Sequence, residues 1–204
     1  SSKPLPMNWI SPITQQGRVI AFCLAITVIS FAQANEIAGR SLSAWTKDLS
    51  VSNETIQLRA AKMIGQFGEP AVPQLTKMLS SENDAIRYWA ASHLGNIGPD
   101  ASAASEALKT AVNDPSLPVR MAINFALSRV DRAGPWFLSL IKGVESADRS
   151  TACAAADFFA RIGPSAKSVL PTLQAVFEKQ SRKGGDYHIA GGVKNALRNI
   201  RNTG

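Results

Sequence analysis

Three side chains could take part in catalysis or metal binding: His93, His188 and Cys153. Imidazoles and thiols act as general bases, nucleophiles and metal ligands, but such a site needs further converging groups. His188 has Asp186 two residues before it, and the sequence offers no other partner for it. No paired carboxylates, Ser-His-Asp order or Cys-His cluster stands out. We therefore predict no catalytic residue, no metal site and no cofactor, and expect that the protein is not an enzyme.

The elements around these residues repeat along the chain. Residues 56–68, 86–98, 119–131 and 151–163 align at spacings of 30, 33 and 32 residues. Apolar residues recur at i, i+4, i+8 and i+11, with Thr151 as the one polar residue among these positions, and this is the stripe of an amphipathic α-helix. The second repeat shows the stripe in the order Ile86, Ala90, Leu94, Ile97.

A turn signal and a second apolar stretch follow each segment. The signals are Gly68-Glu-Pro70, Gly98-Pro99, Gly134-Pro135 and Gly163-Pro164. Glycine permits a left-handed helix end, and proline suits the first turn of the next helix. The second helices are expected over residues 72–79, 103–112, 136–144 and 169–177. Helix, turn and helix at a period near 32 predicts an all-α solenoid of about four to five helix pairs with terminal capping helices.

The run Ile86-Arg87-x-x-Ala90-Ala91-x-x-Leu94-Gly95-x-Ile97-Gly98-Pro99 resembles a HEAT repeat of the short bacterial type, which also occurs in bilin lyases. The resemblance covers residues 51–177, with a weaker end copy at residues 188–200. It implies that Asp114-Pro115 and Val119-Arg120 supply the family's Asp–Arg pairing between repeats. Ala152 stands at the Arg87 position, so this ladder is expected to be interrupted in repeat four.

Position in the repeat favours a structural role for two of the three candidates. His93 aligns with Met63, Ala126 and Phe158, and Cys153 with Leu58, Tyr88 and Met121. Both are interpreted as packed residues. Trp89 is at the edge of the apolar stripe, so it either seals the seam between repeats or contacts a partner.

The first 34 residues predict an export signal, with residues 1–6 upstream of an apparent start at Met7. Arg18 precedes an apolar run over residues 19–32, which ends at the small-x-small site Ala32-Gln-Ala34. An uncleaved membrane anchor is the alternative, but a spanning helix needs about 20 apolar residues. We therefore expect an exported protein, periplasmic or extracellular, without a stable span after cleavage. The domains are then a signal at 1–34, a capping helix at 35–50, the array at 51–178 and a basic cap at 179–204.

Positive charge gathers at one end of the chain. The net charge is +7, yet residues 35–178 carry 14 basic and 14 acidic side chains, and residues 179–204 carry +5. Lys194, Arg198 and Arg201 recur at i, i+4 and i+7 opposite an apolar face. This stripe is either a solvated outer face or a docking site for an acidic partner, which could be a protein, an anionic polymer or a lipid head group.

We predict a non-catalytic, exported interaction or scaffold protein that binds a protein along a concave face made by the second helices. The candidate contacts are Trp89, Gln74, Lys77, Lys109, Lys142, Gln174, Lys194, Arg198 and Arg201. A lyase-like chromophore-handling protein is one alternative, allowed by the resemblance alone and disfavoured by the export signal. A HEAT-like nucleic-acid-binding protein is another, and the neutral array disfavours it, so no nucleic acid is expected.

Overall fold

The computed structural model describes residues 36–131, 134 and 136–202. The chain divides into two units, residues 1–41 and 42–204. In the described part of the first unit, strands β1 (Glu36–Ile37) and β2 (Arg40–Ser41) form an antiparallel hairpin. Its turn residues Ala38 and Gly39 both have positive φ, as a two-residue hairpin turn requires. The predicted export signal lies outside the described residues. Among the residues described, no helix is long and apolar enough to cross a membrane.

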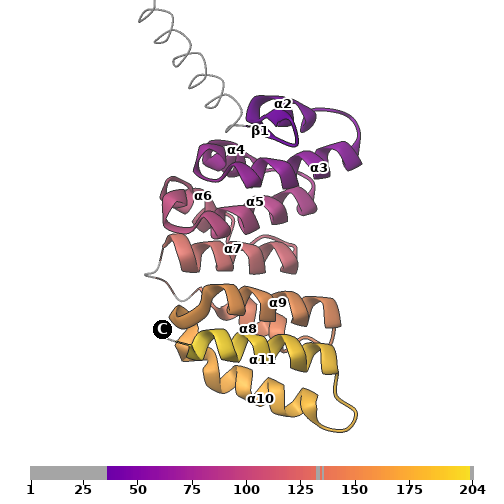
Figure 1. Cartoon of the computed structure of the whole chain (residues 1–204), viewed down its shortest axis with the longest axis vertical. Helices are drawn as coiled ribbons and strands as arrows, with labels where there is room; N and C mark the ends of the chain where they lie inside the picture. Colours follow the sequence, from indigo (N-terminus) through magenta and orange to yellow (C-terminus); the bar gives the residue numbers. More distant parts are fainter. Residues whose placement is uncertain (1–35, 132–133, 135, 203–204) are drawn as a thin grey trace, which may run out of the picture. The chain divides into compact units, whose positions relative to one another are not determined.

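The second unit is a stack of helix pairs, and it confirms the predicted all-α solenoid (Figure 1). We call the members of each pair the first and the second helix. The first helices are α3 (Glu54–Ile64), α5 (Asp84–Ile97), α7 (Leu117–Val130), α9 (Arg149–Ile162) and α11 (Tyr187–Arg201). The second helices are α4 (Val72–Met78), α6 (Ser105–Thr110), α8 (Leu138–Val144) and α10 (Leu170–Ser181). Short 3₁₀ turns connect α3 to α4, α5 to α6 and α9 to α10: η1 (Gly65–Phe67), η2 (Glu69–Ala71), η3 (Gly98–Ala104) and η4 (Gly163–Val169).

A single helix, α2 (Leu42–Asp48), covers the first pair. It packs on α3, and its Trp45 is buried beneath the guanidinium of Arg59, 5.5 Å from the ring centroid. The helix is shorter than the capping helix predicted over residues 35–50, because residues 36–41 form the hairpin instead.

Polar caps fix where the first helices begin. The side chains of Asn53, Asn83, Asp148 and Asp186 accept backbone N–H groups of the first turns of α3, α5, α9 and α11. Hydrogen bonds from Ser150 and Thr151 lower the pKa of Asp148 to about 2. Such caps satisfy N–H groups that the helix itself leaves unpaired.

Two glycines end α5 and α9, and a third follows the 3₁₀ turn after α3; all three differ in one respect from the expected left-handed helix end. Gly68, Gly98 and Gly163 have φ of 69°, 74° and 65°, but their ψ values are −141°, −134° and −140°. This combination is close to a region that only glycine visits readily. It turns the chain sharply into the 3₁₀ segment that precedes each second helix.

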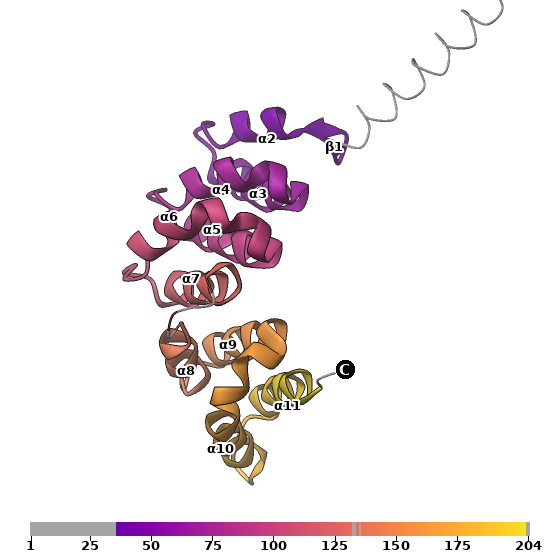
Figure 2. The ribbon, with the colours of Figure 1, turned by 90° about the vertical axis from the view of Figure 1, so that its left-hand side faces the viewer.

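The first helices form the inner layer of the curved unit (Figure 2). Successive first helices pack directly on one another, most extensively α5 on α7 and α9 on α11. A Cβ on Gly65 would lie 1.9 Å from His93 Cγ, and a Cβ on Gly95 would lie 2.4 Å from Phe125 Cε1. Glycine at these positions lets neighbouring first helices approach closely, so the unit curves towards them. The prediction that the second helices make the concave face is therefore wrong.

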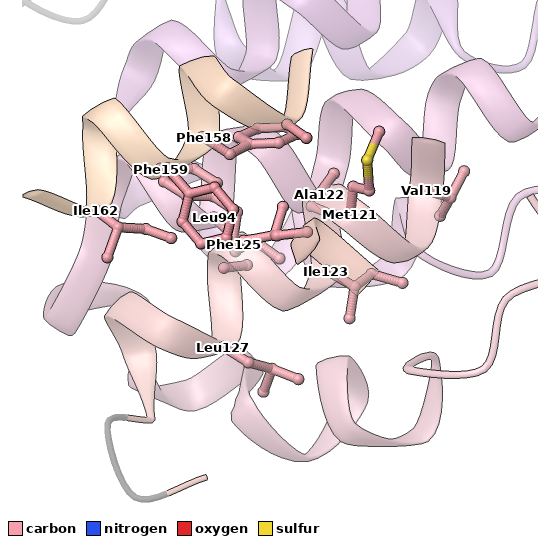
Figure 3. Packing of buried hydrophobic residues seen from close by; sticks show 14 of the residues in the cluster. Leu94, Val119, Met121, Ala122, Ile123, Phe125, Leu127, Phe158, Phe159 and Ile162 are labelled. Atoms are coloured by element: carbon pink, nitrogen blue, oxygen red, sulfur yellow. The ribbon is translucent and has the colours of Figure 1, made fainter. Parts of the chain in front are cut away.

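The core is continuous through the stack and is richest around α7 (Figure 3). All residues from Met121 to Ser128 are buried, which include the polar Asn124 and Ser128. Their polar groups bond locally, with Asn124 Nδ2 donating to the carbonyl of Arg120 and Ser128 Oγ to that of Phe125. Asn124 and Ser128 differ from the residues at the aligned positions of the other repeats. Because both side chains are hydrogen-bonded, their burial leaves neither of them without a partner.

Polar contacts link successive repeats at the start of the first helices. Arg87 binds Asp114 through two bonds of 2.6 and 3.1 Å, Asn83 donates to Glu54, and Arg149 pairs with Asp186 at 2.5 Å. Arg120 contacts Asp114 only at its backbone carbonyl. The partner of the Asp114 carboxylate is thus the arginine of the preceding repeat, which corrects the pairing implied by the resemblance.

Candidate partner-binding surfaces

The inner layer exposes one face of α5 and one face of α9, whereas the middle of α7 is buried on all sides. On α5, Ile86, Ala90 and Leu94 face the core. A helix turns 100° per residue, so Tyr88 and Asn96 point to the opposite side. The corresponding side of α9 carries Asp157 and Arg161. We define the inner surface as Lys62, Tyr88, Trp89, Asn96, Asp157 and Arg161.

Helices α5 and α9 meet on this surface across the recessed α7. The rings of Tyr88 and Phe158 have centroids 6.3 Å apart, and the Arg161 guanidinium donates a hydrogen bond to Asn96. Arg161 also covers Phe125 of α7, at 4.3 Å from the ring centroid. Phe125 stacks on Phe158 at 4.8 Å. These contacts hold three first helices in one fixed arrangement.

Trp89 occupies the centre of the next contact, between α3 and α5. The ammonium of Lys62 lies 4.9 Å from the centroid of the Trp89 ring. The ring stacks on His93 at 5.6 Å and meets Tyr88 edge-on at 5.6 Å. Trp89 is half-buried, so it does seal the seam between repeats while part of the ring remains exposed. A pre-positioned aromatic side chain beside a cation is a typical anchor in protein interfaces.

His93 is packed, as its aligned position in the repeat predicts, but the environment of one ring nitrogen is unusual. The ring packs against the backbone of Gly65, and Nε2 is buried without a hydrogen-bond partner in the described part of the chain. Burial lowers the pKa of His93, and the charge of Arg161 lowers it further. The imidazole is therefore neutral in the folded protein at neutral pH.

Acidification is expected to destabilise the fold through His93. Its pKa is lower when folded than the usual value of about 6.5, so stability decreases as the pH falls below about 6.5. Urea unfolding between pH 8 and 5 measures this slope. His93→Phe should flatten it, since Phe158 fills the same column in α9. His188→Gln is the matched control, because His188 is exposed, and it should leave the slope intact. Equal slopes in both variants would contradict this role for His93.

Cys153 is a half-buried residue of α9, and His188 lines a pocket together with Glu145, Arg149, Lys179 and Asp186. Burial raises the pKa of the Cys153 thiol, with a further contribution from Asp186. A raised pKa disfavours the thiolate form that a nucleophile needs. His188 is exposed at the start of α11, where its backbone N–H bonds to Asp186. Within the described residues, no three His, Cys, Asp or Glu side chains are grouped as metal ligands.

The candidates on the second helices are scattered over the outer layer. Gln74 and Lys77 are on α4, Lys109 on α6 and Lys142 on α8. Lys109 is also engaged, with ion pairs of 2.9 Å to Asp131 and 3.1 Å to Glu106. The structure therefore does not bring these four side chains together on a concave face.

The four C-terminal candidates do come together. Gln174 on α10 and Lys194, Arg198 and Arg201 on α11 line one groove. Arg201 donates to the side-chain oxygen of Gln174 at 2.9 Å, which ties the two helices together. Phe177 and Leu197 add an apolar component. We refer to this groove as the terminal groove.

Of the inner surface, the sequence analysis found only Trp89 and missed Lys62, Tyr88, Asn96, Asp157 and Arg161. One signal in the sequence points to Arg161. The aligned positions of the other three repeats hold Gln66, Asn96 and Arg129, so this position is polar in every repeat. A position that is polar in every repeat, between positions that are apolar, marks a solvent-facing side of the repeated helix. The Arg161–Asn96 contact itself joins residues 65 positions apart and has no local signal.

Three comparisons relate the chain to known proteins, and the match of a family model agrees with the architecture. The family model for HEAT repeats matches residues 42–128, which include α2 to α6 and most of α7. A crystal structure of an engineered protein is similar over 78% of this chain and 79% of that chain, with 20% identity and a TM-score of 0.48. The complex of CpcE and CpcF of phycocyanin lyase from a Nostoc species is similar over 98% and 97%, with 16% identity and a TM-score of 0.44. No curated protein matches the sequence significantly. At these scores the two structures indicate nothing about what this chain binds.

Proposed function

We propose that this is an exported, non-catalytic HEAT-repeat protein that binds a partner protein on its inner surface. HEAT repeats generally mediate protein interactions, and the family model matches residues 42–128. The observation that carries the proposal is the half-exposed Trp89, fixed between Lys62 and His93 on the inner layer. Arg161 and Asp157 supply polar groups of both signs on the same surface. The pattern of residues 18–34 supports export.

Trp89→Ala is expected to weaken partner binding about tenfold or more, because aromatic anchors at the centre of an interface dominate its affinity. The measurement is recovery of partner from the cell envelope by the tagged chain, followed by affinity measurement with the identified protein. Lys62→Glu provides a second variant on an exposed side chain, which tests the surface without removing a packed ring.

The paired variant Lys77→Ala/Lys142→Ala tests the outer layer in the same assay. Both side chains are exposed on second helices. If this variant abolished binding while Trp89→Ala did not, the partner would use the outer layer and the proposal would be wrong. Export is tested separately by N-terminal sequencing of the product, with cleavage expected after Ala34. An intact Met7 start would favour the membrane anchor.

A further inference from the structure

The terminal groove lies between α10 and α11 and has a volume of about 570 Å³. Its lining includes Phe177, Leu197 and three cations, and contains no acidic side chain. In the described residues, Lys194, Arg198 and Arg201 form no ion pair. Arg198 bonds to Asn195 and Arg201 to Gln174, both of which are neutral. Glu178 contacts Gln174 at 3.2 Å but does not line the groove. The groove therefore keeps uncompensated positive charge beside an apolar floor.

The repeat explains the place of these cations. On α5, Ala91 lies three residues before the core residue Leu94, and Gly95 lies one residue after it. Gly95 contacts α7, which is the next first helix. On α9 the same positions relative to Phe159 are Ala156 and Ala160, and both contact α11.

On α11 these two positions, counted from Leu197, hold Lys194 and Arg198. The face on which earlier repeats seat the next first helix is thus basic in α11. A polar outer face is also what a solenoid needs at its end. However, a solvated end does not require a groove with an apolar floor.

We propose that the terminal groove binds an acidic, amphipathic helix of a partner protein, seated where a further first helix would stack. Lys194, Arg198 and Arg201 follow one line of about 10 Å along α11, which matches carboxylates at the same spacing on a facing helix. Phe177 and Leu197 accept its apolar side chains, in the manner of a helix bound in a groove. This inference concerns a surface separate from the inner surface and does not depend on it.

The probe is a fluorescein-labelled, Ala-rich peptide of about 18 residues, with Leu at i, i+4 and i+7 spacing and Glu at i, i+4 and i+7 spacing on the adjacent stripe, so that helix propensity favours the bound form. Fluorescence anisotropy with the full chain measures its Kd. We expect Lys194→Glu/Arg198→Glu to weaken binding about tenfold or more, and rising salt to weaken it further. Arg201 is left intact because it joins α11 to α10. Lys47→Glu/Lys167→Glu changes the net charge equally at exposed positions outside the groove, and should leave the Kd within about twofold.

A second variant tests the groove itself without changing charge. Gly191 lines it, and a Cβ there would have no atom within 4 Å, so Gly191→Phe should obstruct the groove and not the fold. We expect Gly191→Phe to bind the peptide about tenfold more weakly than the unmodified chain does. A scrambled peptide of the same composition should also bind the unmodified chain more weakly than the helical peptide. Equal binding of the helical and scrambled peptides, or full binding by Gly191→Phe, would overturn the proposal. So would binding of phosphatidylglycerol vesicles or heparin with no binding of the peptide, since the stripe would then recognise a lipid surface or an anionic polymer.

Discussion

Asp114→Ala is expected to lower the free energy of unfolding by about 3 kcal/mol, because it leaves the Arg87 charge without its partner between repeats. The two side chains are 6% and 13% exposed and make two charge-assisted hydrogen bonds. Asp114 also accepts the backbone N–H of Ser116 at 2.8 Å and so fixes the start of α7. The loss is placed at the lower end of the range for buried pairs, because Arg87 keeps its bonds to the carbonyls of Ser81 and Glu82.

Urea unfolding of Asp114→Ala, Arg87→Met and the double variant measures the coupling between the two side chains. Glu106→Ala is the matched control. Its pair with Lys109 is solvent-exposed, so its removal should change stability by about 0.5 kcal/mol or less. If Asp114→Ala cost no more than Glu106→Ala, the bridge between repeats would not be a significant part of their stability.

The contribution of Asp114 should also depend on pH. Burial alone would raise the pKa of its carboxyl, but hydrogen bonds from Arg87 and Ser116 outweigh that effect and lower it. A lowered folded pKa means that the stabilisation is complete above the unfolded value of about 3.9 and is lost as the pH falls through the folded pKa. The difference in stability between the unmodified chain and Asp114→Ala should therefore shrink only below about pH 4, whereas the contribution of His93 begins to fall near about pH 6.5.

The periodicity of the sequence was enough to predict the helices and their order. The second repeat has a stripe of apolar residues at helical spacing, formed by Ile86, Ala90, Leu94 and Ile97. This stripe predicts a helix, which the structure shows as α5. The Gly-Pro signals predict where α5 and α9 end, whereas α3 and α7 end four residues before Gly68 and Gly134. These features are local, and the same residues specify them in every repeat.

The direction of curvature could not be predicted in this way. It depends on contacts between helices of different repeats, such as Gly65 with His93 and Gly95 with Phe125, which periodicity does not describe. The terminal groove was predicted in part. The basic stripe on α11 is visible in the sequence, but its meeting with Phe177 and Gln174 of α10 depends on the packing of two helices.

Gly95→Ala should show how strongly the fold depends on the close approach of first helices. In an exposed helix this substitution stabilises by about 1 kcal/mol. Here the new Cβ would lie 2.4 Å from Phe125 Cε1 and 3.0 Å from the backbone of Ala126. Phe125 has little freedom to move, since it is fully buried, stacks on Phe158 and lies beneath Arg161. We expect a net loss of about 2 kcal/mol from overpacking, measured by urea or thermal unfolding.

Gly191→Ala is the matched control for the same substitution in the same kind of element. Gly191 is exposed within α11 and has open space where the methyl group would be, so this variant should gain about 1 kcal/mol. Opposite signs for the two variants would separate helix propensity from helix–helix contact. If Gly95→Ala were instead neutral, α5 and α7 could separate without loss.

The consequence of Gly95→Ala should extend to the inner surface, because Phe125 supports Arg161, which joins α9 to Asn96 on α5. Displacing the Phe125 ring would therefore disturb the α5–α9 contact as well as the α5–α7 contact. Adding Phe125→Leu to Gly95→Ala should recover part of the lost stability, since the smaller side chain makes room for the methyl group. Recovery of stability without recovery of partner binding would show that the ring also holds Arg161 in its binding position.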